Sequence, residues 1–220
     1  MARVARMGSL WPRRIHLYLA CAVCALLSGQ VRTPTEARTW TFDEAAPGMP
    51  PPGFDPGVGS DGRWVVLEDG RNRVLAQTME PSAIHRVLVA RGTAFEDVSV
   101  SVRFKGTGGD RAAGVIWRYS EEGDHYLARF NLSQQRVSVY KVVRGTRSRI
   151  AGLDGLQLDA AAWHTLKAEH RGDLIRVWLN GIPVAETRDR TIHSAGRIGV
   201  WTSPASTAWF DDLRVSALFP

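Results

Sequence analysis

The chain has almost no cysteine: the two that it has, Cys21 and Cys24, both lie within the first 37 of its 220 residues. They fall in an apolar stretch, residues 15–27, that follows several arginines, which is the order of a secretory signal peptide and is too short to span a bilayer. We therefore predict that residues 1–37 are a signal peptide with a short linker and that the protein is exported, either secreted or periplasmic. An exported chain without disulfides must be held together by its core.

The chain also lacks a strong charge imbalance once that segment is set aside. Five of the 28 basic residues and one of the 22 acidic residues precede residue 38, which leaves a net charge of +2 in place of +6. A net charge of +2 is too small to indicate a surface that binds nucleic acid. After removal of the signal the sequence predicts neither a nucleic-acid partner nor a membrane span, and it makes no prediction about oligomeric state.

Helical periodicity is a third absence. From residue 39 to the end no amphipathic pattern of ten or more residues occurs, whereas short runs with period-two alternation recur between turn residues. In residues 96–105 the apolar side chains alternate with Ser and Arg, and Asn180-Gly181 between two such runs is a strong hairpin signal. Residues 47–62, rich in Pro and Gly, are expected to be a loop without a regular element. About a dozen short strands without helices indicate a sandwich or a barrel.

The most informative stretch is residues 114–149, which reads as three neighbouring strands of a meander. Alternation places His125, Leu127, Arg129 and Asn131 on one face of the middle strand, with Tyr126 and Phe130 on the other. A strand face that carries His, Arg and Asn beside aromatic residues is a candidate binding surface.

The order of these elements resembles the concanavalin A-like (laminin-G-like) jelly rolls. The segments that carry the resemblance are Trp-His-Thr-Leu (163–166) and residues 171–181, 196–202 and 210–215. More narrowly, Gly-Val-Ile-Trp-Arg-Tyr (114–119), His-Tyr-Leu-Ala-Arg-Phe-Asn (125–131) and Val-Tyr-Lys-Val-Val-Arg-Gly (139–145) are similar to the secreted bacterial 3-keto-disaccharide hydrolase-type domains. The resemblance implies an all-β fold, a two-sheet antiparallel jelly-roll sandwich, as one domain over residues 38–220.

The paired carboxylates of the β-glucan hydrolases of this superfamily are missing. These enzymes carry acid and nucleophile at alternate positions of one strand, about 5 Å apart. No Glu-x-Asp-x-Glu occurs here, and Asp211 and Asp212, being adjacent, are expected to face opposite sides of a strand. No metal-binding His motif, nucleophile elbow or phosphate loop occurs either. The sequence therefore favours binding over retaining hydrolysis.

The first functional prediction is a secreted domain that binds a glycan or glycoside on its concave sheet. Arg118, His125, Arg129 and Asn131 are its predicted ligand-binding residues, because their side chains can hydrogen-bond sugar hydroxyls; the alternative for exposed arginines is a solvated cation. An interaction or structural module without a small ligand is a further alternative.

The family resemblance implies a second activity, a glycoside hydrolase or lyase acting on 3-keto-glycosides. A proton beside a ketone is acidified, so elimination needs one base, and His125 and His170 are the candidates. The resemblance also implies a structural Ca²⁺ bound by Asp43 and Asp211, with no other cofactor required. Calcium prefers such oxygen ligands, while a cap on a neighbouring loop is the alternative role for Asp211.

Overall fold

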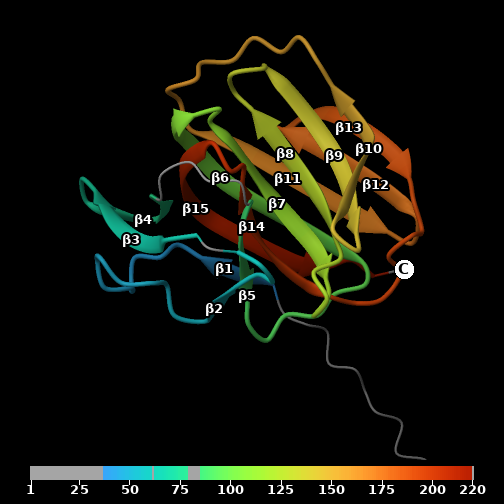
Figure 1. Cartoon of the computed structure of the whole chain (residues 1–220), viewed down its shortest axis with the longest axis horizontal. Helices are drawn as coiled ribbons and strands as arrows, with labels where there is room; N and C mark the ends of the chain where they lie inside the picture. Colours follow the sequence, from blue (N-terminus) through green and yellow to red (C-terminus); the bar gives the residue numbers. More distant parts are fainter. Residues whose placement is uncertain (1–36, 61, 79–84, 220) are drawn as a thin grey trace, which may run out of the picture. The chain divides into compact units, whose positions relative to one another are not determined.

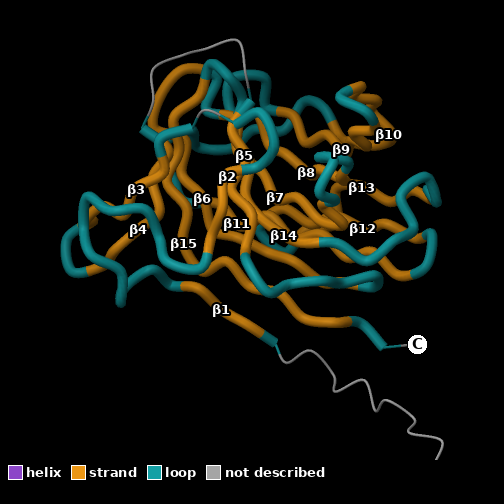
Figure 2. Tube along the Cα trace, turned by 60° about the horizontal axis from the view of Figure 1, so that its bottom comes forward, coloured by secondary structure: helices purple, strands orange, loops and turns teal. Residues whose placement is uncertain are grey.

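Two antiparallel β-sheets packed face to face make up the computed structural model of the chain, which describes residues 37–60, 62–78 and 85–219. No helix occurs among these residues, as Figure 2 shows, so the all-β, two-sheet antiparallel prediction is confirmed. Residues 1–36 of the predicted signal peptide and linker lie outside the described residues. Within them we find no helix with the length and hydropathy that a membrane span requires.

The first sheet has eight strands and the second has seven. The first contains, in spatial order, β13 (Ile182–Arg188), β12 (Leu174–Leu179), β11 (His164–Arg171), β6 (Val98–Gly109), β15 (Ser206–Ala217), β4 (Asn72–Gln77) and β3 (Trp64–Asp69), with β1 (Arg38–Trp40) paired to β15. The second contains β10 (Thr146–Leu153), β9 (Arg136–Val143), β8 (His125–Asn131), β7 (Ala112–Tyr119), β14 (Arg197–Thr202), β5 (Arg86–Ala90) and β2 (Phe54–Pro56). Sequence neighbours such as β7, β8 and β9 are also neighbours in space (Figure 1).

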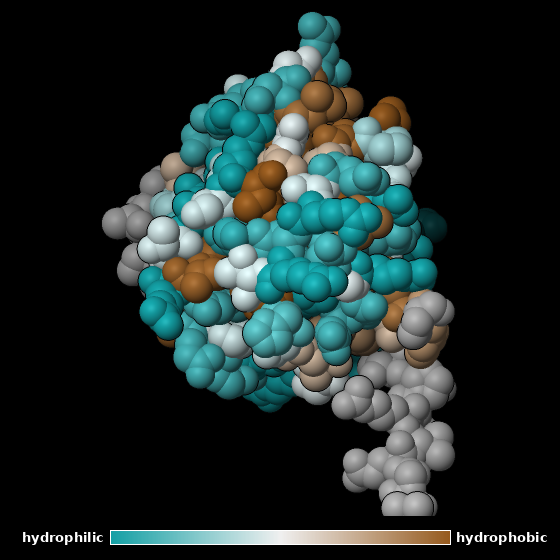
Figure 3. Space-filling view, turned by 90° about the vertical axis from the view of Figure 1, so that its right-hand side faces the viewer, coloured by the Kyte–Doolittle hydropathy of each residue, from teal (hydrophilic) through white to brown (hydrophobic). Residues whose placement is uncertain are grey.

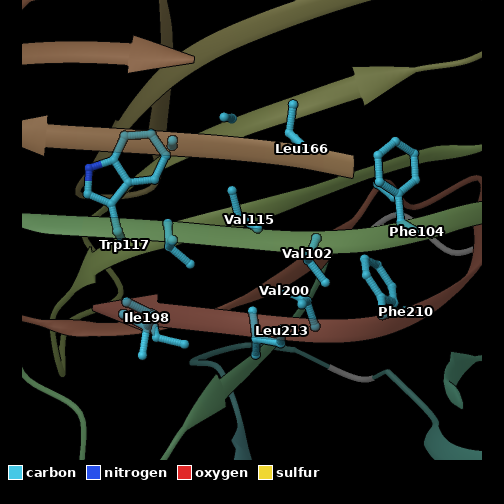
Figure 4. Packing of buried hydrophobic residues seen from close by; sticks show 14 of the residues in the cluster. Val102, Phe104, Val115, Trp117, Leu166, Ile198, Val200, Phe210 and Leu213 are labelled. Atoms are coloured by element: carbon cyan, nitrogen blue, oxygen red, sulfur yellow. The ribbon is translucent and has the colours of Figure 1, made fainter. Parts of the chain in front are cut away.

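The hydrophobic core lies between the two sheets, where each contributes the inward half of an alternating pattern (Figure 4). In β6 the residues from Val98 to Phe104 are buried at every second position, as the sequence predicts. The ring of Phe104 meets that of Phe130 from β8 edge to face at 6.3 Å, so the two sheets are joined directly by aromatic contact. In β6 the intervening residues are half-buried, whereas all eight residues of β7 are buried, so the outer face of the second sheet is covered at β7 as well.

Two loop predictions have different outcomes. Asn180 and Gly181 both have positive φ, 51° and 80°, and join β12 to β13 in the predicted hairpin. Residues 47–62 were expected to lack regular structure, but Phe54–Pro56 pairs with β5 as β2, so that prediction is wrong. Proline is tolerated because β2 is an edge strand, where a missing N–H breaks no inner ladder.

Candidate functional site

The outer face of the seven-stranded sheet collects the polar and aromatic side chains of β8 and β9. On β8, Tyr126 and Phe130 point into the core, whereas Leu127 belongs to a second apolar cluster on the opposite face. His125, Leu127, Arg129 and Asn131 therefore share the outer face, as the alternation predicts. Across the ladder Leu127 pairs with Tyr140 and Arg129 with Ser138, so β9 adds its own polar side chains to the same surface.

One row of this surface crosses three strands at Trp201, Gly114 and Arg129, which are directly paired across β14, β7 and β8. Gly114 has no side chain, and a Cβ there would press on the carbonyl oxygen of Ala128. Over this gap the Arg129 guanidinium lies 5.5 Å from the Trp201 ring, a cation–π contact that leaves the indole 1 % exposed. Glycine in β7 thus makes room for an arginine to lie across the sheet.

Tyr140 is bordered by two guanidinium groups, those of Arg129 at 5.2 Å and Arg147 at 4.9 Å from the ring centre. The Nη2 of Arg129 also donates a hydrogen bond of 3.3 Å to the phenolic oxygen. Burial would raise the pKa of Tyr140, but interaction with the Ser138 hydroxyl, then the charge and hydrogen bond of Arg129 and the charge of Arg147, hold the pKa below its ordinary value. The phenol is therefore easier to ionise than a solvated tyrosine.

Further cations surround this group, and we call the side chains of Arg129, Arg136, Tyr140, Arg147 and Arg149 together the arginine face. Arg149 pairs directly with Tyr140 across β9 and β10, so both share the outer surface. The His85 ring lies 5.9 Å from that of Trp201, and its partial burial and the charges of Arg147 and Arg129 lower its pKa. The sequence-based prediction named Arg129 but missed the others, although alternation in residues 136–140 places Arg136 and Tyr140 on one face.

Arg118 is placed elsewhere by a local irregularity in β7. Its φ is +50°, its side chain is 2 % exposed, and its partners are carbonyl oxygens. Nε donates to Glu96 at 2.8 Å, Nη1 to Ile192 at 2.7 Å and Nη2 to Gly172 at 3.3 Å. Three loops at one end of the sandwich are held together in this way. Little of the guanidinium is left for a ligand, so we leave Arg118 out of the proposed site.

His125 and Asn131 lie on the outer face but are buried. Asn131 accepts a hydrogen bond from the backbone N–H of Gln134 at 2.9 Å, which closes the turn after β8. The Nδ1 of His125 lies 2.7 Å from the carbonyl oxygen of Gly123, and burial lowers its pKa to about 4. Both side chains shape the ends of β8, and their exposed fractions of 5 % or less leave little surface for a ligand.

His170 occupies the core between the sheets, on the far side of the seven-stranded sheet from His125. Its Nδ1 accepts a hydrogen bond of 3.0 Å from the Trp117 indole, and its ring meets the edge of the Tyr126 ring at 4.9 Å. Burial and the charge of Arg118 lower its pKa to about 4. The two histidines do not converge on one site, and a fully buried His170 offers no base to a bound substrate.

The predicted calcium ligands have protein partners. Asn72 Nδ2 donates to Asp211 Oδ2 at 3.0 Å, and Arg73 Nη1 donates to the backbone oxygen of Asp43 at 2.7 Å. Among the described residues no group of three or more His, Cys, Asp or Glu side chains could hold a metal ion. The calcium site stays a prediction, without a ready-made cluster of ligands.

Asp211 and Asp212 were expected on opposite faces of the last strand, and this is wrong. Both carboxylates accept from Arg103 Nη1, at 3.3 and 3.2 Å. The reason is a register shift in β15 between Asp211 and Arg214, where Asp212 has a φ of +47°. Such a bulge breaks the two-residue period and brings adjacent side chains to the same side.

A hollow of about 380 Å³ lies on the other sheet, beside Trp178 and Pro183 at the register shift of β12. Its charged lining residues, Arg176 and Glu186, pair with each other at 2.7 Å. Figure 3 views the molecule from the side of β12 and β13, where hydrophilic residues cover most of the surface. Because its charges are already satisfied, this hollow offers a ligand less than the arginine face does.

Comparisons with known structures agree on the fold. The carbohydrate-binding module CBM66 from Bacillus subtilis is 20 % identical with a TM-score of 0.64, covering 75 % of this chain and 96 % of that one. A β-1,3-1,4-glucanase (lichenase) derived from a mouse hindgut metagenome is 15 % identical with a TM-score of 0.59, covering 83 % and 99 %. A β-glucanase from Bacillus licheniformis is 12 % identical with a TM-score of 0.60, covering 83 % and 98 %. The predicted concanavalin A-like jelly roll is thereby confirmed.

No curated protein matches the sequence. A family model does match, over residues 39–216, which includes nearly every described strand. The resemblance stated from the motifs of β7, β8 and β9 is therefore confirmed: the chain belongs to the family of 3-keto-alpha-glucoside-1,2-lyase-like domains.

Proposed function

We propose that the protein binds a carbohydrate on the outer face of its seven-stranded sheet, with Arg129, Tyr140 and Arg147 as the principal contacts. The observation that carries the proposal is the grouping of two guanidinium forks around one half-buried phenol on an open sheet face. Arginine N–H groups and a phenolic hydroxyl can bond sugar hydroxyls, while the ring offers an apolar surface to a pyranose. The carbohydrate-binding module and the glucanases of the same fold support this choice.

Alanine at Tyr140 is the direct test. We expect Y140A to weaken binding to a glycan or 3-keto-glycoside at least about tenfold, since both the ring and the acceptor for Arg129 are lost. Binding of the purified chain is measured by calorimetry across a panel of glycosides and their 3-keto derivatives. W178A, which removes a half-buried tryptophan from the outer surface of the other sheet, is the matched control and should bind normally. Equal loss in both variants, or full binding by Y140A, would contradict the assignment.

A lyase reaction on 3-keto-glycosides is the second candidate, favoured by the family and by the lowered pKa of Tyr140. The ketone at C3 acidifies the proton at C2. An ionised Tyr140 would take that proton, the electron pair would form a C1=C2 bond, and the C1–O bond would break to release the aglycone, which is then protonated to an alcohol. The half-buried position of Tyr140 supports it as the base over His125 and His170, which are buried.

Phenylalanine at Tyr140 separates the two candidates. If elimination occurs, Y140F should lose nearly all turnover of a 3-keto-glycoside, measured by the ultraviolet absorbance of the enone, because the ring stays but the base is gone. H85Q, which changes the neighbouring imidazole, should keep most of the activity and so serves as the comparison. Turnover that survives in Y140F would eliminate Tyr140 as the base, and no turnover by the unmodified chain would leave binding alone.

A further inference from the structure

The positive charge of the arginine face exceeds the negative charge of the carboxylates that lie beside it. Of its four arginines, Arg136 and Arg149 share one acid, Asp154, at 3.3 and 3.1 Å. Among the described residues, neither Arg129 nor Arg147 has a carboxylate within salt-bridge distance. Across the rest of the described chain arginines are commonly paired, as Arg176 is with Glu186 and Arg188 with Asp173. Other described arginines, such as Arg71, also lack a carboxylate within salt-bridge distance. Arg129 and Arg147 differ from them in that both guanidinium groups lie against one aromatic ring, that of Tyr140.

The positive charges also act on one another. Burial lowers the pKa of Arg129, and the charges of Arg147 and Arg136 lower it further, against the opposing effect of Tyr140. Burial lowers the pKa of His85, and the charges of Arg147 and Arg129 lower it further. Like charges held close together at a partly desolvated surface cost free energy, and an anion among them would remove that cost. Among the described residues the Nε of Arg129 has no hydrogen-bond partner.

We infer that the carbohydrate bound by this protein carries an anionic substituent, a carboxylate or a sulfate, held by Arg129 and Arg147. This inference rests on the proposed carbohydrate site and specifies its ligand class. Both guanidiniums border the same Tyr140 ring, at 5.2 and 4.9 Å from its centre, so a sugar bound at that ring is within reach of both. Guanidinium groups bind planar and tetrahedral anions through paired N–H donors, which gives both affinity and orientation.

The test compares ligands that differ in charge alone. Binding of the purified chain is measured for oligogalacturonate against its methyl ester, and for dextran sulfate against dextran, so that the two pairs distinguish carboxylate from sulfate. We expect one charged member to bind at least about tenfold more tightly than its neutral counterpart, with a preference that falls as salt is raised. Polyglutamate at the same charge concentration should bind more weakly, because it lacks the sugar.

Two variants test whether Arg147 is responsible for the preference for the charged glycan. R147A removes an exposed side chain, so the fold should be kept, and the preference for the charged glycan should fall about tenfold. R71A, in the turn between β3 and β4 of the other sheet, is the matched control and should change nothing. Equal binding of charged and neutral glycans would overturn the inference and leave the carbohydrate site standing. The inference would also be overturned if polyglutamate bound as tightly as the charged glycan, or if R147A kept the full preference for the charged over the neutral glycan. Failure of every glycan to bind would instead overturn the proposed function.

Discussion

Replacing Arg118 with alanine is expected to lower the free energy of unfolding by about 3–5 kcal/mol, among the largest effects of any single substitution in this chain. The guanidinium supplies the hydrogen bonds to Glu96, Ile192 and Gly172 and lies 3.6 Å from the carboxylate of Asp97. Alanine would leave the buried carbonyl of Ile192 without its donor, and a buried unsatisfied group costs about 1–3 kcal/mol. It would also remove the donor of the partly buried bonds to Glu96 and Gly172. Urea unfolding of both proteins at neutral pH measures the difference.

Two further variants test whether the loss of stability comes from the hydrogen bonds of Arg118. R118K keeps the positive charge and places a similar L-residue at the φ of +50°. Its single compact ammonium cannot reach three carbonyls at once, so we expect a loss of stability smaller than that of R118A. R176A removes an exposed arginine paired with Glu186 and should cost less than about 1 kcal/mol. If R118A unfolds like the unmodified protein and loses glycan binding instead, Arg118 is a ligand residue and its structural role here is wrong.

Arg118 also shows why part of the site could not be predicted from the sequence. Strict alternation assumes a regular strand, and β7 departs from it where Arg118 takes a left-handed φ and the pairing with β14 shifts register. Arginine gives no sign of such a conformation, whereas glycine or asparagine would. Asp212 causes the same kind of irregularity in β15, where its φ is also positive. One irregular residue reverses which face every later side chain in that strand occupies.

Where strands are regular, the sequence predicted more. The alternation of β8 correctly placed Arg129 on a surface and Phe130 in the core, because period two is a direct consequence of the pleat. A local pattern cannot predict which side chains Arg129 contacts on neighbouring strands. Trp201 comes from β14, far along the chain, and Tyr140 comes from β9. The arginine face depends on interstrand register, which follows from the packing of the whole core.

The stability of the fold is expected to fall steeply as the pH drops from about 6.5 to about 4. His125 and His170 are 5 % and 0 % exposed, and burial lowers the pKa of each from 6.5 to about 4. In the unfolded chain both imidazoles have the ordinary pKa, so over this window the unfolded state binds more protons than the folded state. Stability is therefore fully present above pH 6.5 and is lost as the pH falls, by about 3 kcal/mol for each histidine. Typical domains have only about 5–15 kcal/mol in all.

A glutamine at His170 isolates one of the two contributions. H170Q cannot take up a proton, yet its amide oxygen can accept the hydrogen bond that Trp117 Nε1 now donates to the imidazole. The variant should have a lower stability at pH 7, and a plot of unfolding free energy against pH whose slope between 6.5 and 4 is about 1.4 kcal/mol per pH unit shallower. W178A, which removes no titratable group, should leave the slope unchanged. Parallel curves for H170Q and the unmodified chain would mean that His170 already titrates normally in the folded protein, and the sealed Trp117–His170 contact in the core would then have to open to water well above pH 4.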